Sequence, residues 1–385
     1  MNNITKLYFF NFFRHLHFMS AVLVPFFLTW GGITYLQMMF LQSWFVIWIT
    51  ILEVPTGTIA DHFGRKTSII LGVFINAFAA FIYALFPSYY LFLLAEFLWA
   101  VSFTLVSGAD EALLYDSLKE MKKEKESKKI LGRYGSSALL GIVIAAPIGS
   151  FIARYGLQYP TMAIVIPMFI AGLIGLTIRE PKFKREQENY FDTLFKGINY
   201  FLRHKELKIL AFDSISISVI SFMIIWTYQP KLLELGFALT MLGFVASAST
   251  IFEIIFQNNF ENLEKLFGSR KNYLFFSAIS LGIAFIGLAL TRQIWIAVIL
   301  IVMIFAVGFT RRNLISNYMH KYIESKNRAT VISSVSMLDG LGRAIVYPLV
   351  GILAGISLQL CLLVLGSIAI IFSIFSRVEE GHLID

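Results

Sequence analysis

The chain has a single cysteine and few charged residues, and each scarcity restricts what kind of protein it can be. Cys361 is the only cysteine among 385 residues, so no disulfide can form within the chain. Asp, Glu, Lys and Arg together make up 15% of the residues, whereas 57% are hydrophobic and 16% are aromatic. Soluble domains carry about 25% charged residues. The composition therefore excludes an ordinary soluble protein and predicts an all-α membrane protein.

Sequence motifs of nucleotide-driven and hydrolytic enzymes are also missing. The chain contains no Gly-x-x-x-x-Gly-Lys-Ser/Thr phosphate loop, no His-Glu-x-x-His pair and no Gly-x-Ser-x-Gly turn. We therefore predict that the protein is not an enzyme and that it uses neither a cofactor nor a metal. The net charge of +8 is spread over short loops between apolar runs. This distribution argues against a nucleic-acid partner and indicates topology signals in a lipid bilayer.

Long apolar runs, in contrast, fill most of the sequence. A helix needs about 20 apolar residues to cross the ~30 Å hydrocarbon layer, and about twelve such runs are present. Residues 179–208 form the longest break between them, and 190–207 have the apolar spacing of an amphipathic helix. We predict a six-helix bundle at 1–178, a cytoplasmic linker at 179–208 and a second six-helix bundle at 209–385.

The positions of the basic residues predict the orientation of the chain in the membrane. Most of the 32 Lys and Arg residues lie at the amino terminus, in every second loop or at the carboxyl terminus. Basic loops remain on the cytoplasmic side, so we expect a multi-pass protein of the cell membrane with both termini cytoplasmic. Twelve spans suffice for one permeation path, and a monomer is the expected state.

A short charged turn between the second and third apolar runs carries the most specific motif in the chain. It reads Gly-x-x-x-Asp-x-x-Gly-Arg-Lys and is made of Gly57, Asp61, Gly64, Arg65 and Lys66. This spacing resembles the loop between helices 2 and 3 of the major facilitator superfamily of secondary transporters, and the chain as a whole resembles the bacterial drug-efflux members. The segment 267–271 repeats part of the motif about 200 residues later.

The resemblance implies a fold of twelve transmembrane helices in two pseudo-symmetric six-helix bundles, which move about a central site to give alternating access. It also implies that Asp61 contacts the start of the eleventh span near Arg328, and that Arg65 pairs with Asp116 at the end of the fourth span. Gly141 and Gly149 lie around Pro147 on the fifth span, where they approach a glycine–proline signature of antiporters without matching it.

Charged residues inside apolar runs are the candidates for substrate or proton binding, because each costs a few kcal/mol in the membrane unless it faces a cavity or a partner. On the fourth span, Glu96 and Asp110 are fourteen residues apart, which places them on one face of a continuous helix together with Phe103. Glu111 follows directly. These acids form either a ladder that carries protons or meets a cationic substrate, or salt bridges to basic helix ends.

Two further spans carry charges that could share a face. Asp339 and Arg343 on the eleventh span have an i, i+4 spacing, which suits either a neutralising pair or a substrate clamp. Arg14 and His17 on the first span are three residues apart, although Arg14 could instead extend to the interface. Asp213 lies near the end of the seventh span, and we predict a structural role for it.

Together these features predict a secondary transporter that moves a small organic molecule by alternating access, coupled to protons and directed outward as an antiporter. A proton-coupled symporter for nutrient uptake is the alternative within this class. From a different class, a non-transporting membrane sensor or scaffold is the remaining possibility. Acidic candidates and abundant aromatic residues favour cationic or amphipathic substrates.

Overall fold

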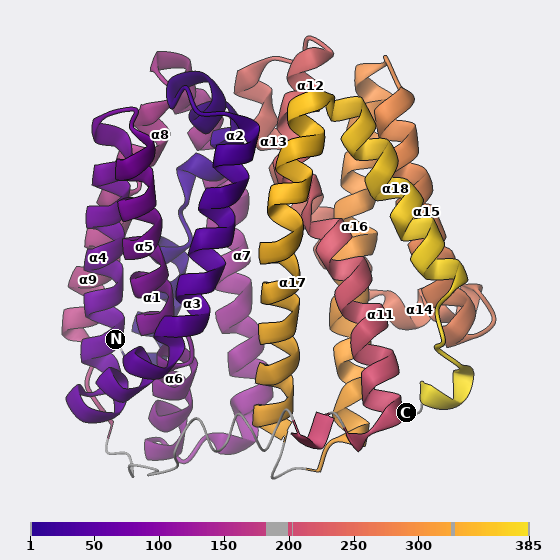
Figure 1. The fold of residues 1–385 in the computed structure, drawn as a ribbon. Helices are drawn as coiled ribbons and strands as arrows, with labels where there is room; N and C mark the ends of the chain where they lie inside the picture. Colours follow the sequence, from indigo (N-terminus) through magenta and orange to yellow (C-terminus); the bar gives the residue numbers. More distant parts are fainter. Residues whose placement is uncertain (1, 182–198, 202, 325–327, 384–385) are drawn as a thin grey trace. The chain divides into compact units, whose positions relative to one another are not determined.

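The computed structural model describes residues 2–181, 199–201, 203–324 and 328–383, and these described residues form helices and no strand (Figure 1). Eleven helical segments are long and apolar enough to cross a membrane, and a twelfth apolar helix, α18 (Leu358–Ile374), is slightly shorter. The predicted all-α membrane fold is therefore confirmed. The amphipathic helix predicted at 190–207 lies largely outside the described residues.

Contacts within the chain divide it into two units. The first unit comprises residues 1–187 and 238–247. Its helices run side by side in Figure 1 and span the following residues: α1 Asn3–Arg14, α2 Leu23–Pro25, α3 Tyr35–Phe63, α4 Arg65–Leu85, α5 Tyr89–Val106, α6 Ala109–Glu120, α7 Ser127–Ile152, α8 Gln158–Ala163 and α9 Val165–Thr177.

The second unit comprises residues 188–237 and 248–385. Helix α13 (Leu242–Asn258) begins in the first unit and continues in the second. The other helices of the second unit are α11 Lys205–Phe222, α12 Ile224–Glu234, α14 Phe260–Leu266, α15 Arg270–Leu290, α16 Ile294–Met319, α17 Arg328–Ile356 and α18. Figure 1 shows the carboxyl terminus at the end of this unit where α11 begins.

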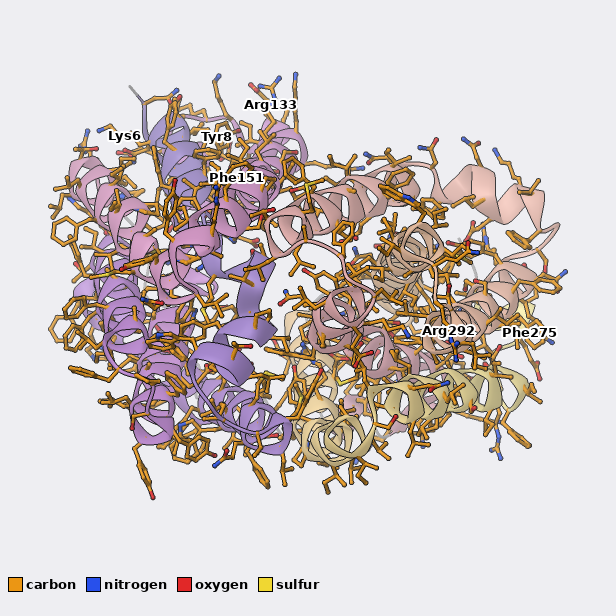
Figure 2. The ribbon with its side chains drawn as sticks, turned by 90° about the horizontal axis from the view of Figure 1, so that it is seen from above. Lys6, Tyr8, Arg133, Phe151, Phe275 and Arg292 are labelled. Carbon is orange, nitrogen blue, oxygen red and sulfur yellow. The ribbon has the colours of Figure 1, made fainter. Side chains whose placement is uncertain are left out.

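Both units have apolar exteriors as well as apolar cores. Figure 2 shows side chains rich in carbon around the outline, with Phe275 near one edge; Phe275 is 39% exposed and Phe151 is 55% exposed. In water such surfaces would be unfavourable, but lipid covers them in a membrane. In the core of the first unit, the rings of Phe26, Tyr83 and Phe92 pack with centroids 5.5–6.0 Å apart.

Two spans of the first unit are interrupted. Helix α1 ends at Arg14, and the backbone from His15 to His17 leaves the helical geometry before a short 3₁₀ turn. Helix α5 ends at Val106, and Gly108 adopts a φ of +77° before α6 begins. Non-helical backbone at membrane depth is tolerated where protein buries it or where it lines a cavity. In transporters, discontinuous helices mark binding sites.

These breaks correct two predictions that assumed continuous helices. Arg14 and His17 do not share a helix face, because α1 ends between them. The stripe from Glu96 through Phe103 to Asp110 is not continuous either, because it crosses the break at Gly108. Phe103 is 50% exposed whereas Glu96 is 7% exposed, so the two side chains do not lie in one environment.

Glycines on α7 allow its backbone to approach the broken first span. A Cβ at Gly141 would lie 2.7 Å from the carbonyl oxygen of Phe12, and one at Gly149 would lie 1.8 Å from that of Phe18. No side chain fits at either position. The two glycines that approach an antiporter signature in sequence therefore have a packing role in the structure.

Candidate functional site

Arg14, Asp110 and Tyr134 form a polar cluster where the two helix breaks of the first unit meet. Arg14 Nη1 lies 3.1 Å from Asp110 Oδ2, and the Tyr134 hydroxyl donates a hydrogen bond of 2.8 Å to the same oxygen. Asp110 Oδ1 accepts from the backbone N–H of Glu111 at 2.8 Å. Arg14 lies at the carboxyl end of α1 and Asp110 at the amino end of α6, so both charges are favourable to the helix dipoles.

This cluster contains predicted residues and one that the sequence did not indicate. Asp110 is buried, with its side chain 7% exposed, whereas Arg14 is 23% exposed and Glu111 is exposed. Tyr134 was not predicted, because a phenol on an apolar helix carries no charge to single it out. The structure thus unites Arg14 and Asp110 in one ion pair and leaves the Glu111 side chain at the surface.

Glu96 has a separate and different environment. Its side chain is buried between α3, α4 and α5, and its Oε1 accepts a hydrogen bond of 3.1 Å from the Gln42 amide. The Tyr83 hydroxyl lies beside the carboxyl group without a hydrogen bond of good geometry. No ion pair joins Glu96 to a cation in the described part of the chain. Glu96 and Asp110 therefore do not form one ladder of carboxylates.

Aromatic rings connect the Glu96 environment to the break in the first span. The Tyr83 ring lies edge-on to Trp99 with centroids 5.9 Å apart, and Trp99 packs against the His17 ring at 5.5 Å. His17 Nδ1 is buried and has no hydrogen-bond partner among the described residues. His15, in contrast, bonds the carbonyl oxygen of Asn11 through Nδ1 at 2.8 Å. The two histidines thus differ in that only the Nδ1 of His15 has a hydrogen-bond partner among the described residues.

In the second unit, Asp339 and Arg343 form the predicted i, i+4 pair on α17. Arg343 Nη2 lies 2.8 Å from Asp339 Oδ2, and Arg312 Nη2 of α16 lies 3.7 Å from the same oxygen. The Arg343 guanidinium also lies over the Phe222 ring, 4.6 Å from its centroid. Asp339 is 3% exposed. Two cations therefore share one buried carboxylate, an arrangement that can release one of them to an anionic or polar ligand group.

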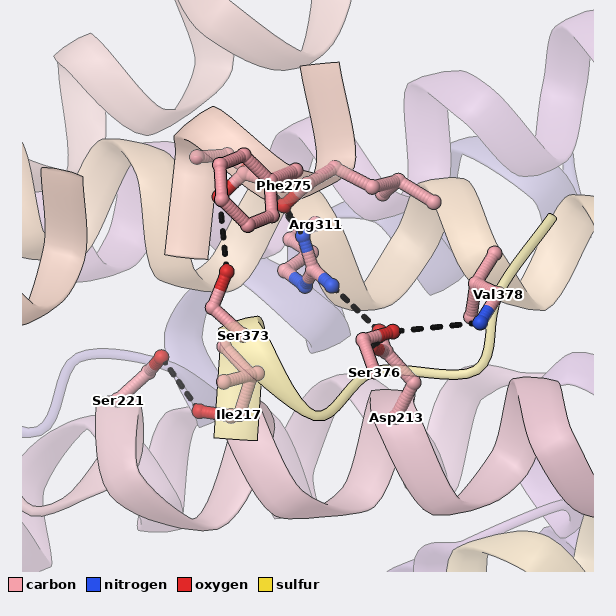
Figure 3. Close-up of polar contacts among 10 residues, drawn as sticks. Asp213, Ile217, Ser221, Phe275, Arg311, Ser373, Ser376 and Val378 are labelled. Carbon is pink, nitrogen blue, oxygen red and sulfur yellow. Dashed lines mark hydrogen bonds and ion pairs between the residues drawn. The ribbon is translucent and has the colours of Figure 1, made fainter. Parts of the chain in front are cut away.

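A second buried ion pair, Asp213–Arg311, joins α11 to α16 (Figure 3). Arg311 also donates to the carbonyl oxygen of Leu274 and, at 2.8 Å, to Ser277 Oγ. The Ser376 hydroxyl donates to Asp213 Oδ1 at 2.7 Å. Both charged side chains are nearly inaccessible, at 6% and 4% exposure. These contacts agree with a structural role for Asp213, and its partner Arg311 was not foreseen.

The loop motif between α3 and α4 makes the ion pair that the resemblance implies, since Arg65 contacts Asp116 at the end of α6. Gly64, with a φ of +96°, joins the two helices. Lys66 and Arg65 donate their backbone N–H groups to the carboxylate of Glu180, at 2.8 and 3.0 Å. Gly57 and Asp61 are exposed, and the predicted contact of Asp61 stays a prediction.

The second unit repeats this arrangement at the start of α15. Glu380 accepts backbone N–H groups from Arg270 at 3.1 Å and Lys271 at 2.8 Å. Burial raises the pKa of Glu380, but these two N–H groups, the Ser269 hydroxyl and the Arg270 charge outweigh it and hold the pKa below its ordinary value. One feature of the sequence could have pointed to this contact. Glu180 and Glu380 lie about 200 residues apart, as the two loop motifs do.

The chain is similar to known transport proteins in sequence and in fold. The sequence model of the Major Facilitator Superfamily matches residues 7–309 and 209–382. Multidrug resistance protein 2 of Bacillus subtilis (strain 168) is 27% identical over 169 residues, which cover 44% of this chain and 40% of that relative. The match thus spans less than half of that relative's length. An uncharacterized MFS-type transporter of the same organism, YxaM, is 21% identical over 315 residues, covering 79% of this chain and 77% of the relative.

Solved structures resemble the chain over nearly its whole length. The nucleoside transporter NupG superposes with a TM-score of 0.82 at 16% identity, covering 97% of this chain and 98% of NupG. A D-xylose-proton symporter superposes with a TM-score of 0.73 at 15% identity, covering 98% and 97%. At these identities the likeness shows a common fold and says nothing of the substrate.

Proposed function

Because the chain belongs to the Major Facilitator Superfamily and is a multi-pass membrane transporter rather than an enzyme, we propose that it exports a small organic molecule in exchange for protons. Transport proceeds by alternating access of two six-helix bundles in the cell membrane, with both termini in the cytoplasm. The matched relative that is named a multidrug resistance protein supports export.

The environment of Glu96 is the observation that carries the proposal. A buried carboxylate is costly when it is charged and has no cation beside it. Glu96 has a neutral amide and a phenol as its neighbours, whereas Asp110 has Arg14. Glu96 therefore gains most from binding a proton and becomes the proton carrier. It releases the proton when a change in the bundle admits water.

The Arg14–Asp110–Tyr134 cluster serves as the substrate-responsive part of this mechanism. A cationic group on the substrate competes with Arg14 for the carboxylate of Asp110. The carboxylate of Glu111, at the same end of α6, binds the same cationic group. His17 and Trp99 supply an aromatic surface beside the same break. In the second unit, the Asp339–Arg343 pair is a clamp that opens when a ligand group or a proton replaces one partner. The Arg65–Asp116 pair belongs to the gate.

Proteoliposomes that contain a pH-sensitive dye test this proposal. A pH gradient is imposed, and lipophilic cations, sugars, amino acids and organic anions are added one at a time. Wild type is compared with Glu96→Gln and with a matched control, Glu120→Gln, which removes an exposed carboxylate at the end of α6. We expect a cationic or amphipathic compound to drive protons in the opposite direction in wild type and in the control.

The Glu96→Gln variant should lose this proton movement and still exchange labelled for unlabelled substrate across the membrane, because its substrate contacts remain. Normal coupling in that variant would remove Glu96 from the mechanism. Protons and compound moving in the same direction would replace export with uptake symport. If no compound moves in either protein, a sensor or scaffold role takes the place of transport.

A further inference from the structure

A cavity of about 950 Å³ lies on the second unit between the start of α11 and the end of α18. Figure 1 shows both helix ends beside the carboxyl terminus. None of the residues assigned above to substrate, proton or gating roles lines this cavity. Its lining combines two kinds of side chain that seldom occur together, namely a group of cations and a group of exposed aromatic and aliphatic residues.

Four basic side chains line the cavity: Lys205, Lys208, Lys271 and Arg377. All four are exposed, and none forms an ion pair with a carboxylate within the described part of the chain. They come from three different elements, since Lys205 and Lys208 belong to α11, Lys271 opens α15, and Arg377 follows α18. Cations from separate elements that converge without acidic partners make a region of positive potential suited to an anion.

The acids in the lining do not cancel this charge. Asp213 forms an ion pair with Arg311 and accepts a hydrogen bond from the Ser376 hydroxyl (Figure 3). Glu379 is the other carboxylate in the lining, and its single charge offsets only one of the four cations. The Ser376–Asp213 hydrogen bond also has a positioning effect, because it fixes the chain directly before Arg377. The cavity therefore keeps an excess of positive charge.

The opposite part of the lining is apolar. Phe212, Phe375 and Ile371 are 64%, 76% and 52% exposed. The rings of Phe212 and Phe372 meet edge to face at 5.9 Å and join α11 to α18. Phe212 lies seven residues beyond Lys205, which is about 10 Å along the helix. The cations thus lie at the helix ends, where lipid headgroups are, and the apolar side chains extend toward the hydrocarbon.

We propose that this cavity binds an anionic phospholipid, with the headgroup phosphate between the lysines and Arg377 and the acyl chains along Phe212, Ile371 and Phe375. Basic pockets between transmembrane helices at the membrane surface recognise such headgroups. The site is independent of the transported molecule and of proton coupling. The bound lipid would contact α11, the start of α15 and the end of α18, and all three helices belong to the second unit.

Native mass spectrometry of the purified full-length protein tests the site. Delipidated protein in detergent is titrated with phosphatidylglycerol, with phosphatidylcholine of the same acyl chains, and with soluble glycerol 3-phosphate. Wild type is compared with Lys205→Gln/Lys208→Gln and with Lys128→Gln/Lys129→Gln, which removes two exposed lysines from the first unit as a charge-matched control. Thermal unfolding checks that all three proteins are equally folded.

We expect wild type and the control to retain one phosphatidylglycerol more tightly than phosphatidylcholine, and the Lys205→Gln/Lys208→Gln variant to bind phosphatidylglycerol about 30-fold more weakly, at roughly fivefold per basic residue. Equal binding in the two double variants would overturn the proposal, and so would equal binding of the two lipids by wild type. If glycerol 3-phosphate binds as tightly as the lipid, the cavity takes a soluble anion and the lipid assignment is wrong.

Discussion

Replacing Arg311 by Met should destabilise the second unit strongly, because it leaves the Asp213 carboxylate buried without a cation. Arg311 contributes three contacts, to Asp213, to the carbonyl oxygen of Leu274 and to Ser277 Oγ. After the substitution only the Ser376 hydroxyl remains for Asp213. Removing one partner of a buried ion pair costs about 3–5 kcal/mol. We expect a loss of that size in the free energy of unfolding.

The contacts also predict an asymmetry between the two partners. Asp213→Asn leaves the Arg311 charge buried without a counter-ion but keeps its acceptors at Leu274 and Ser277, so its cost should lie at the low end of this range, about 3 kcal/mol. The double variant should cost less than the sum of the single variants, since it leaves neither charge behind. Such a difference in a double-mutant cycle measures the coupling between the pair.

Unfolding in mixed detergent micelles, followed by the loss of helical circular dichroism, measures these free energies. Arg312→Met is the matched control, because it removes the same kind of side chain one position along α16. The Arg312 side chain is 40% exposed and lies 3.7 Å from Asp339, which keeps its closer partner Arg343 at 2.8 Å, so its loss should cost only about 0–1 kcal/mol. If Arg311→Met unfolds no more easily than Arg312→Met, the buried pair does not stabilise the unit and our reasoning fails.

Further predictions concern packing and pH. Gly149→Val should prevent stable folding, because a Cβ there would lie 1.8 Å from the carbonyl oxygen of Phe18. Gly132→Ala is the control, since a Cβ at Gly132 meets open space, and it should be neutral or stabilising by up to about 1 kcal/mol. Melting temperatures in detergent compare the two variants. Glu380 has a lowered pKa, so its stabilisation of α15 is complete above the ordinary value of 4.5 and is lost as the pH falls through the lowered pKa. Melting temperatures between pH 6 and pH 3 should therefore fall more in wild type than in Glu380→Gln, and parallel curves would contradict this.

Much of the fold followed from the sequence because a membrane imposes few solutions. Apolar runs of sufficient length must be helices, and the eleven spans and α18 occur where such runs stand. The break in the fourth span could have been predicted from Gly108, because glycine readily adopts a positive φ. The break from His15 to His17 had none, because no glycine or proline marks it, and it depends on the close approach of α7 through Gly141 and Gly149.

The candidate site was only half predictable, and the reason is chemical. A charge within an apolar run is visible in a sequence, so Arg14, Asp110 and Glu96 could be named in advance. Their partners Tyr134 and Gln42 carry no charge and come from helices far along the chain. Only the packing of the helices shows that Asp110 has a cation beside it and that Glu96 does not.

Comparison of the two halves separates what the fold needs from what the function needs. Glu180 and Glu380 each bind two backbone N–H groups at the start of an equivalent helix, so this contact belongs to the common scaffold. Each half also joins its first and fourth spans by an ion pair, but the order of charges is reversed between Arg14–Asp110 and Asp213–Arg311. The contacts of Glu180 and Glu380 therefore report the architecture, whereas the reversed charges of the ion pairs distinguish the two halves.

Glu96 has no such counterpart. The stretch of α16 that occupies the equivalent place, 297–301, consists only of apolar residues. The scaffold of the second half thus has no carboxylate at this place, and such a group costs free energy in a membrane wherever it is charged. The asymmetry therefore separates Glu96 from the ion pairs that occur in both halves. It favours the proposal that this carboxyl group carries protons, which the Glu96→Gln transport measurement decides.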